Sequence, residues 1–143
     1  NTEEEDDSQY QMLKQLELSV DDHIELIQYC NLKNIKFFST AFDLDGISYL
    51  SSLNLGVFKI PSGELTNFPY LRAVANTGLP VILSTGMANL DEIQKSVEVL
   101  ISNGTKKNQI TVLAVIDLTD LGGFAKITEK GYNAGALIEY EGE

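Results

Sequence analysis

Lys59 stands in the middle of VFKIPSGE (57–64), an apolar segment with the composition of a buried β-strand. An ammonium group buried without a partner is costly, so such a lysine either extends to water or meets a negative charge. Ser62, Gly63 and Glu64 follow directly. Hydroxyl groups and glycine amides beside a fixed lysine suit a phosphate or a carboxylate, so we predict that Lys59 faces an anion.

Two other strand-like segments end in residues of the same kind. NIKFFST ends in Thr40, and PVILSTG carries Ser84 and Gly86 at its end. Each part also has an ordinary interpretation, because Ser, Thr and Gly are common in turns and helix caps. A lysine in a short strand also often reaches water. Their coincidence at three strand ends favours the anion site.

The elements that must position these residues alternate along the chain. Helices are predicted at 8–18, 19–30, 45–53, 67–76 and 89–104, and strands at 34–40, 57–61, 80–84 and 110–116. This order predicts an α/β fold of parallel βα repeats with right-handed crossovers. The strands are apolar runs, which predicts a sheet covered on both faces. Ligands of parallel sheets bind at the carboxyl ends of the strands, where all the candidate residues fall.

Three of these helices begin with recognisable signals. Ser19 and Asp22 form the signature of a capping box. Asn67 and Asn89 are predicted N-caps. His23, the one histidine of the chain, falls in the second helix. We expect it to be a surface residue rather than a metal ligand, because metal sites need several clustered donors.

Composition limits the classes of function. The chain has 143 residues, 43% of them hydrophobic, and 21 acidic against 10 basic side chains give a formal net charge of −11. This charge argues against nucleic acid and anionic membranes as partners. Cys30 is the single cysteine, and neither a signal peptide nor an apolar run of about 20 residues is visible, so we expect a cytoplasmic protein.

Three regions are predicted from the charge and element pattern. Residues 1–7 are an acidic flexible end, 8–116 hold the βα repeats, and 117–143 form a tail. In the tail, FAKIT (124–128) and ALIEY (136–140) are possible strands of a β-hairpin that covers a sheet edge. Because the first residue is not Met, we expect the chain to be a piece of a longer protein.

The motifs of the chain resemble those of the sialic acid synthase family from about Ser8 to Leu113. The resemblance rests on SQYQMLKQLELSVDDHIELIQYC, FFSTAFDLDGISYL and FKIPSGELTNFPYLRAVANTGLPVILSTGM. It implies a (β/α)8 TIM barrel, of which this chain holds about four strands, in a homodimeric enzyme. Such enzymes condense phosphoenolpyruvate with an N-acylated hexosamine, similar to N-acetylmannosamine, and give a sialic-acid-type nonulosonate.

The resemblance also implies roles for individual residues. Those implied to contact phosphoenolpyruvate are Thr40, Lys59, Ser62, Ser84 and Gly86. Glu64 is implied to face the reacting centre, where it handles a proton or holds the sugar. A structural role as a cap for the next helix is the alternative for Glu64.

The chain departs from the family after ITVL (110–113). The residues that follow cannot be aligned, and a fusion, a frameshift and a real variant all remain open as explanations. The family uses a divalent manganese or magnesium ion, whose histidine ligands lie in the later half of the barrel, so we expect no metal ligands here. A second hypothesis is therefore a non-catalytic barrel fragment that binds anions or pairs with another subunit.

Overall fold

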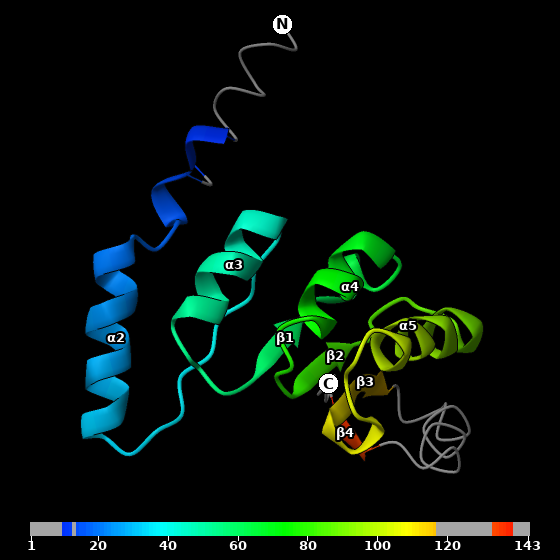
Figure 1. Cartoon of the computed structure of the whole chain (residues 1–143). Helices are drawn as coiled ribbons and strands as arrows, with labels where there is room; N and C mark the ends of the chain where they lie inside the picture. Colours follow the sequence, from blue (N-terminus) through cyan, green and yellow to red (C-terminus); the bar gives the residue numbers. More distant parts are fainter. Residues whose placement is uncertain (1–9, 13, 117–132, 139–143) are drawn as a thin grey trace, which may run out of the picture. The chain divides into compact units, whose positions relative to one another are not determined.

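Four parallel strands form one sheet in the order β1-β2-β3-β4 (Figure 1). Their bounds are Phe58–Ile60 for β1, Val81–Ser84 for β2, Ile110–Ile116 for β3 and Asn133–Ile138 for β4. The structure is a computed structural model that describes residues 10–12, 14–116 and 133–138. The chain divides into two units, Asn1–Phe37 and Phe38–Glu143, and the sheet belongs to the second.

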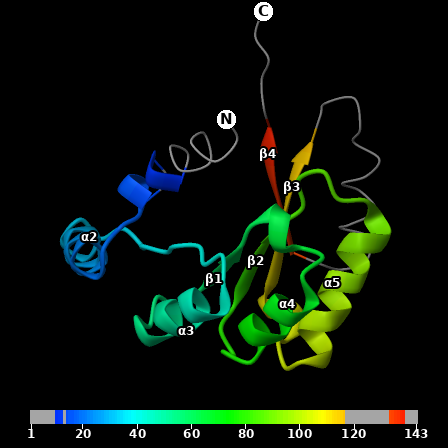
Figure 2. The ribbon, with the colours of Figure 1, turned by 90° about the horizontal axis from the view of Figure 1, so that it is seen from above.

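Three helices lie on one side of this sheet (Figure 2). They are α3, Leu44–Ser52, α4, Phe68–Ala75, and α5, Leu90–Ser102, with α4 packed between the other two. Two short 3₁₀ turns, η1 at Ser62–Glu64 and η2 at Lys107–Gln109, complete the connections. The predicted α/β fold of parallel βα repeats is confirmed.

Each of these helices begins at a capping side chain. Asp43 accepts a hydrogen bond of 2.6 Å from the backbone N–H of Gly46 at the start of α3. Asn67 and Asn89 cap α4 and α5, as predicted, and accept from the third helical residue at 3.3 and 3.0 Å. These bonds satisfy amide groups that have no partner inside the helix, which fixes where each helix starts.

The two faces of the sheet differ in burial. The helix-facing side chains of β1, β2 and the first part of β3 are all buried, namely Phe58, Ile60, Val81, Leu83, Ile110 and Val112. The alternate residues are only partly buried, namely Lys59, Ile82, Ser84, Thr111 and Leu113. The prediction that both faces are covered therefore holds fully for one face only.

The strand predicted at 34–40 is wrong. In this segment only Thr40 pairs with the sheet, through a single parallel bridge to Lys59. The neighbouring strand β1 has three residues, which offers a short ladder, and Ile35 and Phe38 are exposed. An apolar run therefore continues here without the backbone partners that a strand requires.

The first unit holds helical residues at 10–12 and 14–16 and the helix α2, Val20–Leu32. The predicted capping box is present, because the Ser19 and Asp22 side chains each bond to the other's backbone N–H. The prediction that His23 is a surface residue is wrong, because only 8% of its surface is exposed. Its ring makes a T-shaped contact with the ring of Phe37, with centroids 6.1 Å apart, and Nδ1 lies 3.0 Å from the Ser19 carbonyl oxygen.

At the other end of the chain, β4 overlaps the predicted strand 136–140 and pairs in parallel with β3, at the edge of the sheet. The second predicted strand, 124–128, lies outside the described residues. None of the described helices has the length and apolar character that a membrane span requires.

Candidate functional site

Lys59 is the centre of the candidate site. It lies in the middle of β1, and its Nζ atom donates hydrogen bonds to Ser84 Oγ on β2 and, at 3.2 Å, to the Ile60 carbonyl oxygen. An ammonium group has three N–H donors, so one remains for a further partner. Because Ser84 Oγ accepts from Lys59, its own O–H is left to donate. Two hydrogen-bond donors from neighbouring strands therefore meet at one place.

The charge of Lys59 is not balanced by a carboxylate of the described residues. Burial lowers the pKa of Lys59 below its ordinary value, and no charged neighbour in the described part of the chain contributes to this shift. A neighbouring carboxylate would act in the opposite direction, because it favours the charged ammonium. A partly buried cation with no counter-charge is a favourable place for an anion brought by a ligand.

Thr40 is the second predicted residue at this place. It pairs with Lys59 across a parallel bridge, and paired residues of adjacent strands point to the same face of a sheet. Ser84 stands two residues beyond Ile82, the β2 partner of Lys59, and so projects to that face as well. Thr40, Lys59 and Ser84 therefore lie on one face, the one that the helices do not cover.

Ser62 and Gly86 bring the turns after β1 and β2 together. A Cβ atom added at Gly86 would lie 3.3 Å from Ser62 Oγ and 3.5 Å from Ser62 Cβ. The glycine thus lets one turn approach the other closely. Ser62 is exposed, and it is the first residue of the η1 turn. Its hydroxyl group adds a third donor at the carboxyl edge of the sheet.

Glu64, at the end of η1, is directed toward α4. Its Oε2 atom accepts a hydrogen bond of 2.6 Å from Asn67 Nδ2. Asn67 itself caps α4, so Glu64 contacts the capping residue and does not supply the cap. The alternative role of Glu64 as the cap of the next helix therefore belongs to Asn67. The role of Glu64 in the reaction stays a prediction.

Tyr70 connects α4 to the segment that carries Thr40. The phenol is 1% exposed, and its O–H donates a hydrogen bond of 2.7 Å to the carbonyl oxygen of Ala41. Burial, with smaller contributions from the charges of Glu64 and Asp43, raises the pKa of Tyr70 well above its ordinary value. The phenol therefore stays protonated and keeps this hydrogen bond over the physiological pH range.

Sequence reasoning missed the contacts of Asn67 and Tyr70. Asn67 was predicted as a helix cap, and Tyr70 was not singled out. The spacing in SGELTN, with a carboxylate three residues before an asparagine, is a signal for the first contact. No local pattern signals the second, because Ala41 and Tyr70 are far apart in the chain.

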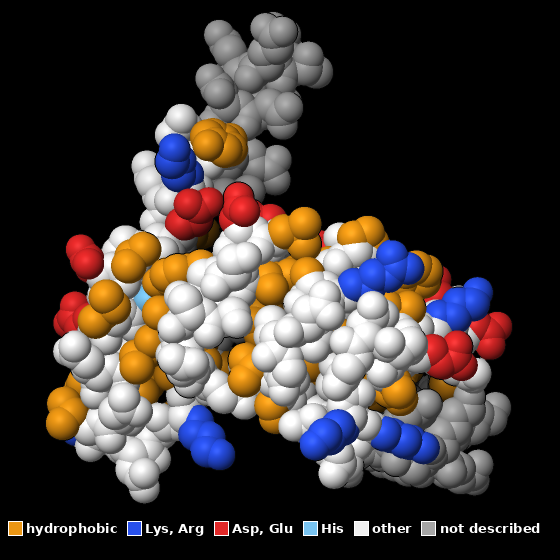
Figure 3. All heavy atoms as spheres, viewed as in Figure 1, with side chains coloured by type: hydrophobic (Ala, Val, Ile, Leu, Met, Phe, Trp, Pro, Cys, Tyr) orange, Lys and Arg blue, Asp and Glu red, His pale blue; other side chains and the backbone are white. Residues whose placement is uncertain are grey.

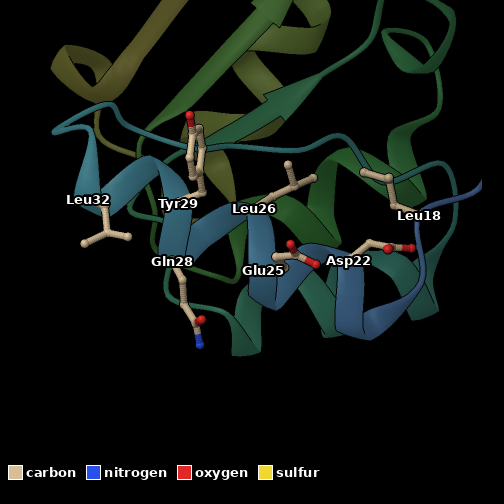
Figure 4. A pocket seen from close by; sticks show the side chains of 7 residues that line it. All are labelled: Leu18, Asp22, Glu25, Leu26, Gln28, Tyr29 and Leu32. Atoms are coloured by element: carbon tan, nitrogen blue, oxygen red, sulfur yellow. The ribbon is translucent and has the colours of Figure 1, made fainter.

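A separate groove of about 400 Å³ lies in the first unit (Figure 4). It is lined by Leu18, Asp22, Glu25, Leu26, Gln28, Tyr29 and Leu32. Figure 3 shows orange hydrophobic side chains at the surface in the region of α2. The exposed hydrophobic residues of α2 are Val20, Ile24, Tyr29 and Leu32. Two carboxylates and no cation among the lining residues make this groove unsuited to a phosphate.

The described residues contain no group of three or more His, Cys, Asp and Glu side chains that is arranged to hold a metal ion. His23, in α2, belongs to no such group. A cation site with the usual number of protein ligands is therefore not formed by this part of the chain.

Comparison with known proteins identifies one family. Residues 1–117 match the NeuB family. An N,N'-diacetyllegionaminic acid synthase of Campylobacter jejuni is 51% identical over 108 residues, which are 76% of this chain and 32% of that enzyme. The chain thus spans about a third of the length of this curated relative.

Solved structures agree with the fold. The spore coat polysaccharide biosynthesis protein SpsE of Bacillus subtilis superposes with a TM-score of 0.74 over 84% of this chain and 36% of that chain, at 24% identity. The N-acetylneuraminic (sialic) acid synthetase of Leptospira borgpetersenii, solved with citrate, superposes with a TM-score of 0.70 over 84% of this chain and 43% of that chain, at 25% identity.

Proposed function

Because the chain belongs to the NeuB family of sialic acid synthases, we propose that it carries the phosphoenolpyruvate-binding part of a synthase for a sialic-acid-type nonulosonate. The observation that carries the proposal is the Lys59 ammonium, which is partly buried, hydrogen-bonded to Ser84 and without a carboxylate partner among the described residues. Phosphoenolpyruvate brings both a phosphate and a carboxylate, the two groups that such a cation attracts.

The donors divide between the two ends of this ligand. Lys59 and Ser84 meet the phosphate, with Ser62 beside Gly86 at the outer edge. Thr40, on the other side of Lys59 from β2, lies by the carboxylate. In a site closed to water, fixed donors stabilise negative charge more strongly than they do at the protein surface. They also hold the enol carbon in one orientation.

In the proposed reaction, the C3 carbon of phosphoenolpyruvate forms a bond to the aldehyde carbon of an N-acylated hexosamine. Water adds at C2, the bond from C2 to the phosphate ester oxygen breaks, and the phosphate leaves. One proton of the water ends on the aldehyde oxygen, which becomes a hydroxyl, and the other leaves with the phosphate, so the product is a nine-carbon 2-keto sugar acid. Glu64 is proposed to hold the sugar or to move a proton. The similarity to an N,N'-diacetyllegionaminic acid synthase supports this class of N-acylated sugar.

The family resemblance implies a divalent manganese or magnesium ion, and the described residues offer no cluster of three or more side chains that could hold it. We propose that its ligands, the remaining sugar contacts and the homodimer contacts belong to the rest of the synthase.

Titration of phosphoenolpyruvate by calorimetry tests the proposal. We expect weak binding by the wild-type chain and a loss of about tenfold or more for Lys59→Ala, which corresponds to roughly 1.4 kcal/mol. Lys95→Ala is the matched control, because Lys95 is exposed on α5. Equal affinities for wild type and Lys59→Ala would reject the anion site.

The alternative, a non-catalytic fragment that binds anions or pairs with another subunit, makes a different prediction about turnover in the complete synthase. We expect the 143-residue chain by itself to release no phosphate from phosphoenolpyruvate and N-acetylmannosamine, because it spans about a third of its relative. Release by the complete synthase, and its loss with Lys59→Ala, would distinguish an enzyme part from a binding fragment.

A further inference from the structure

Glu64 is the acidic residue nearest to Lys59 along the chain, and it is not the partner of Lys59. Its Oε2 atom accepts from Asn67 Nδ2 at 2.6 Å, and the Lys59 ammonium donates to Ser84 and to the Ile60 carbonyl oxygen. Glu64 stands two residues after Ser62, at the end of the η1 turn that borders the site. Glu64 thus follows Lys59 by five residues, in the turn that β1 leads into, and its carboxylate is bonded to Asn67 instead of Lys59.

The orientation of Asn67 is fixed by α4. Its Oδ1 atom accepts from the backbone N–H of Tyr70 at 3.3 Å, so Nδ2 is the group that faces Glu64. The backbone N–H of Asn67 also donates to the Glu64 carbonyl oxygen at 3.0 Å. Aspartate and serine cap helices as well as asparagine does, and glycine does so almost as well. Asparagine differs from them because its amide caps the helix and still offers two N–H donors.

We propose that Asn67 is a positioning residue that holds the Glu64 carboxylate against α4 and thereby keeps the Lys59 ammonium available to an anion. The inference rests on the proposed function, because the anion in question is phosphoenolpyruvate. If Glu64 were released, it would either pair with Lys59 or repel the phosphate. Both outcomes weaken anion binding through charge, and both need the Glu64 carboxylate.

A double-mutant cycle separates this role from a structural one. Asn67→Gly removes the donor and costs the cap little. We expect it to weaken phosphoenolpyruvate binding about fivefold when residue 64 is Glu, since a unit charge brought close to the site acts with this order of energy. In the Glu64→Gln background we expect less than about a twofold change. The same ratio in both backgrounds would overturn the proposal, because helix capping alone predicts equal effects.

Two further variants guard the cycle. Asn89 is the equivalent cap of α5, and its side chain accepts from the Glu92 backbone N–H. We expect Asn89→Gly to change the affinity for phosphoenolpyruvate by less than about twofold. If Asn67→Gly does not unfold cooperatively, Asn67→Ser replaces it, since serine caps α4 without the side-chain amide and adds no charge.

A second readout does not depend on phosphoenolpyruvate. The pKa of Lys59, followed by NMR at its ε-carbon, should rise in Asn67→Gly, because the released carboxylate favours the charged ammonium. The rise should be absent in the double variant with Glu64→Gln. If wild type does not bind phosphoenolpyruvate, the proposed function fails while this titration still decides on Asn67. An unchanged Lys59 pKa in Asn67→Gly would contradict the positioning role.

Discussion

The ammonium of Lys59 donates a hydrogen bond to the hydroxyl of Ser84 across two neighbouring parallel strands. Both side chains project from the sheet face that the helices leave uncovered. A cation inside a sheet is expensive, and this one has hydroxyl and carbonyl partners but no carboxylate among the described residues. The arrangement is suited to binding an anion, and it costs stability while no anion is bound.

Replacing Lys59 with methionine should therefore stabilise the chain. Burial lowers the pKa of Lys59, so the folded state holds its charge at a cost, and Lys59→Met removes that cost. We expect the Tm to rise by about 2 °C at pH 7. The advantage should shrink as the pH rises from the lowered pKa toward the ordinary lysine value of 10.5, because wild type then loses the charge as well.

Thermal denaturation at pH 7 and pH 10 checks this expectation. Lys95→Met, on the exposed side of α5, is the control and should change stability by less than about 0.5 kcal/mol at both values. A lower Tm for Lys59→Met at pH 7 would show that the hydrogen bonds of Lys59 outweigh the cost of burying its charge.

Gly86→Ala should weaken phosphoenolpyruvate binding with little loss of stability. The added Cβ atom would lie 3.3 Å from Ser62 Oγ, so the serine side chain must move by a few tenths of an ångström. We expect about a threefold loss of affinity and a stability cost below about 1 kcal/mol. Gly63→Ala is the control, since nothing lies within 4 Å of its added Cβ. Equal effects of the two variants on affinity would remove Ser62 from the site.

Tyr70→Phe should destabilise the chain by about 1–2 kcal/mol, because the buried Ala41 carbonyl oxygen loses the donor that it accepts from. The raised pKa of Tyr70 determines how the free energy of unfolding depends on pH. The folded state keeps this proton while an unfolded tyrosine loses it near the ordinary value of 10.0. The stabilisation is therefore complete below pH 10 and falls as the pH rises above it.

Urea denaturation of wild type and Tyr70→Phe from pH 7 to 11 measures this difference. Tyr29→Phe serves as the control, because Tyr29 is 58% exposed, and it should leave the free energy of unfolding unchanged. A gap between wild type and Tyr70→Phe that widens above pH 10 would contradict the assignment.

Local signals predicted most of the fold. Asn67 and Asn89 cap helices where their sequence places them, and strand 110–116 has the predicted bounds. The prediction of a strand at 34–40 was wrong, because apolar composition does not show whether a neighbouring strand offers backbone hydrogen bonds. The prediction that His23 lies at the surface failed because helical periodicity does not show tertiary contacts such as that with Phe37.

For the candidate site, the strand-end rule collected Thr40, Lys59, Ser62, Ser84 and Gly86, and the structure brings them to one edge of the sheet. Their roles in binding stay predictions. The spacing of Glu64 and Asn67 allows the hydrogen bond between their side chains, but the sequence does not show whether the rotamers form it, so the orientation of Glu64 could not be predicted.

The central claim is that the charge of Lys59 is completed by the phosphate or carboxylate of phosphoenolpyruvate. The most direct measurement is an NMR pH titration of the Lys59 ε-carbon, with and without saturating phosphoenolpyruvate. We predict that the pKa of Lys59 lies below 10.5 in the free chain and rises when the ligand binds, because the anion favours the ammonium. A Lys59 pKa that saturating phosphoenolpyruvate leaves unchanged would contradict the account.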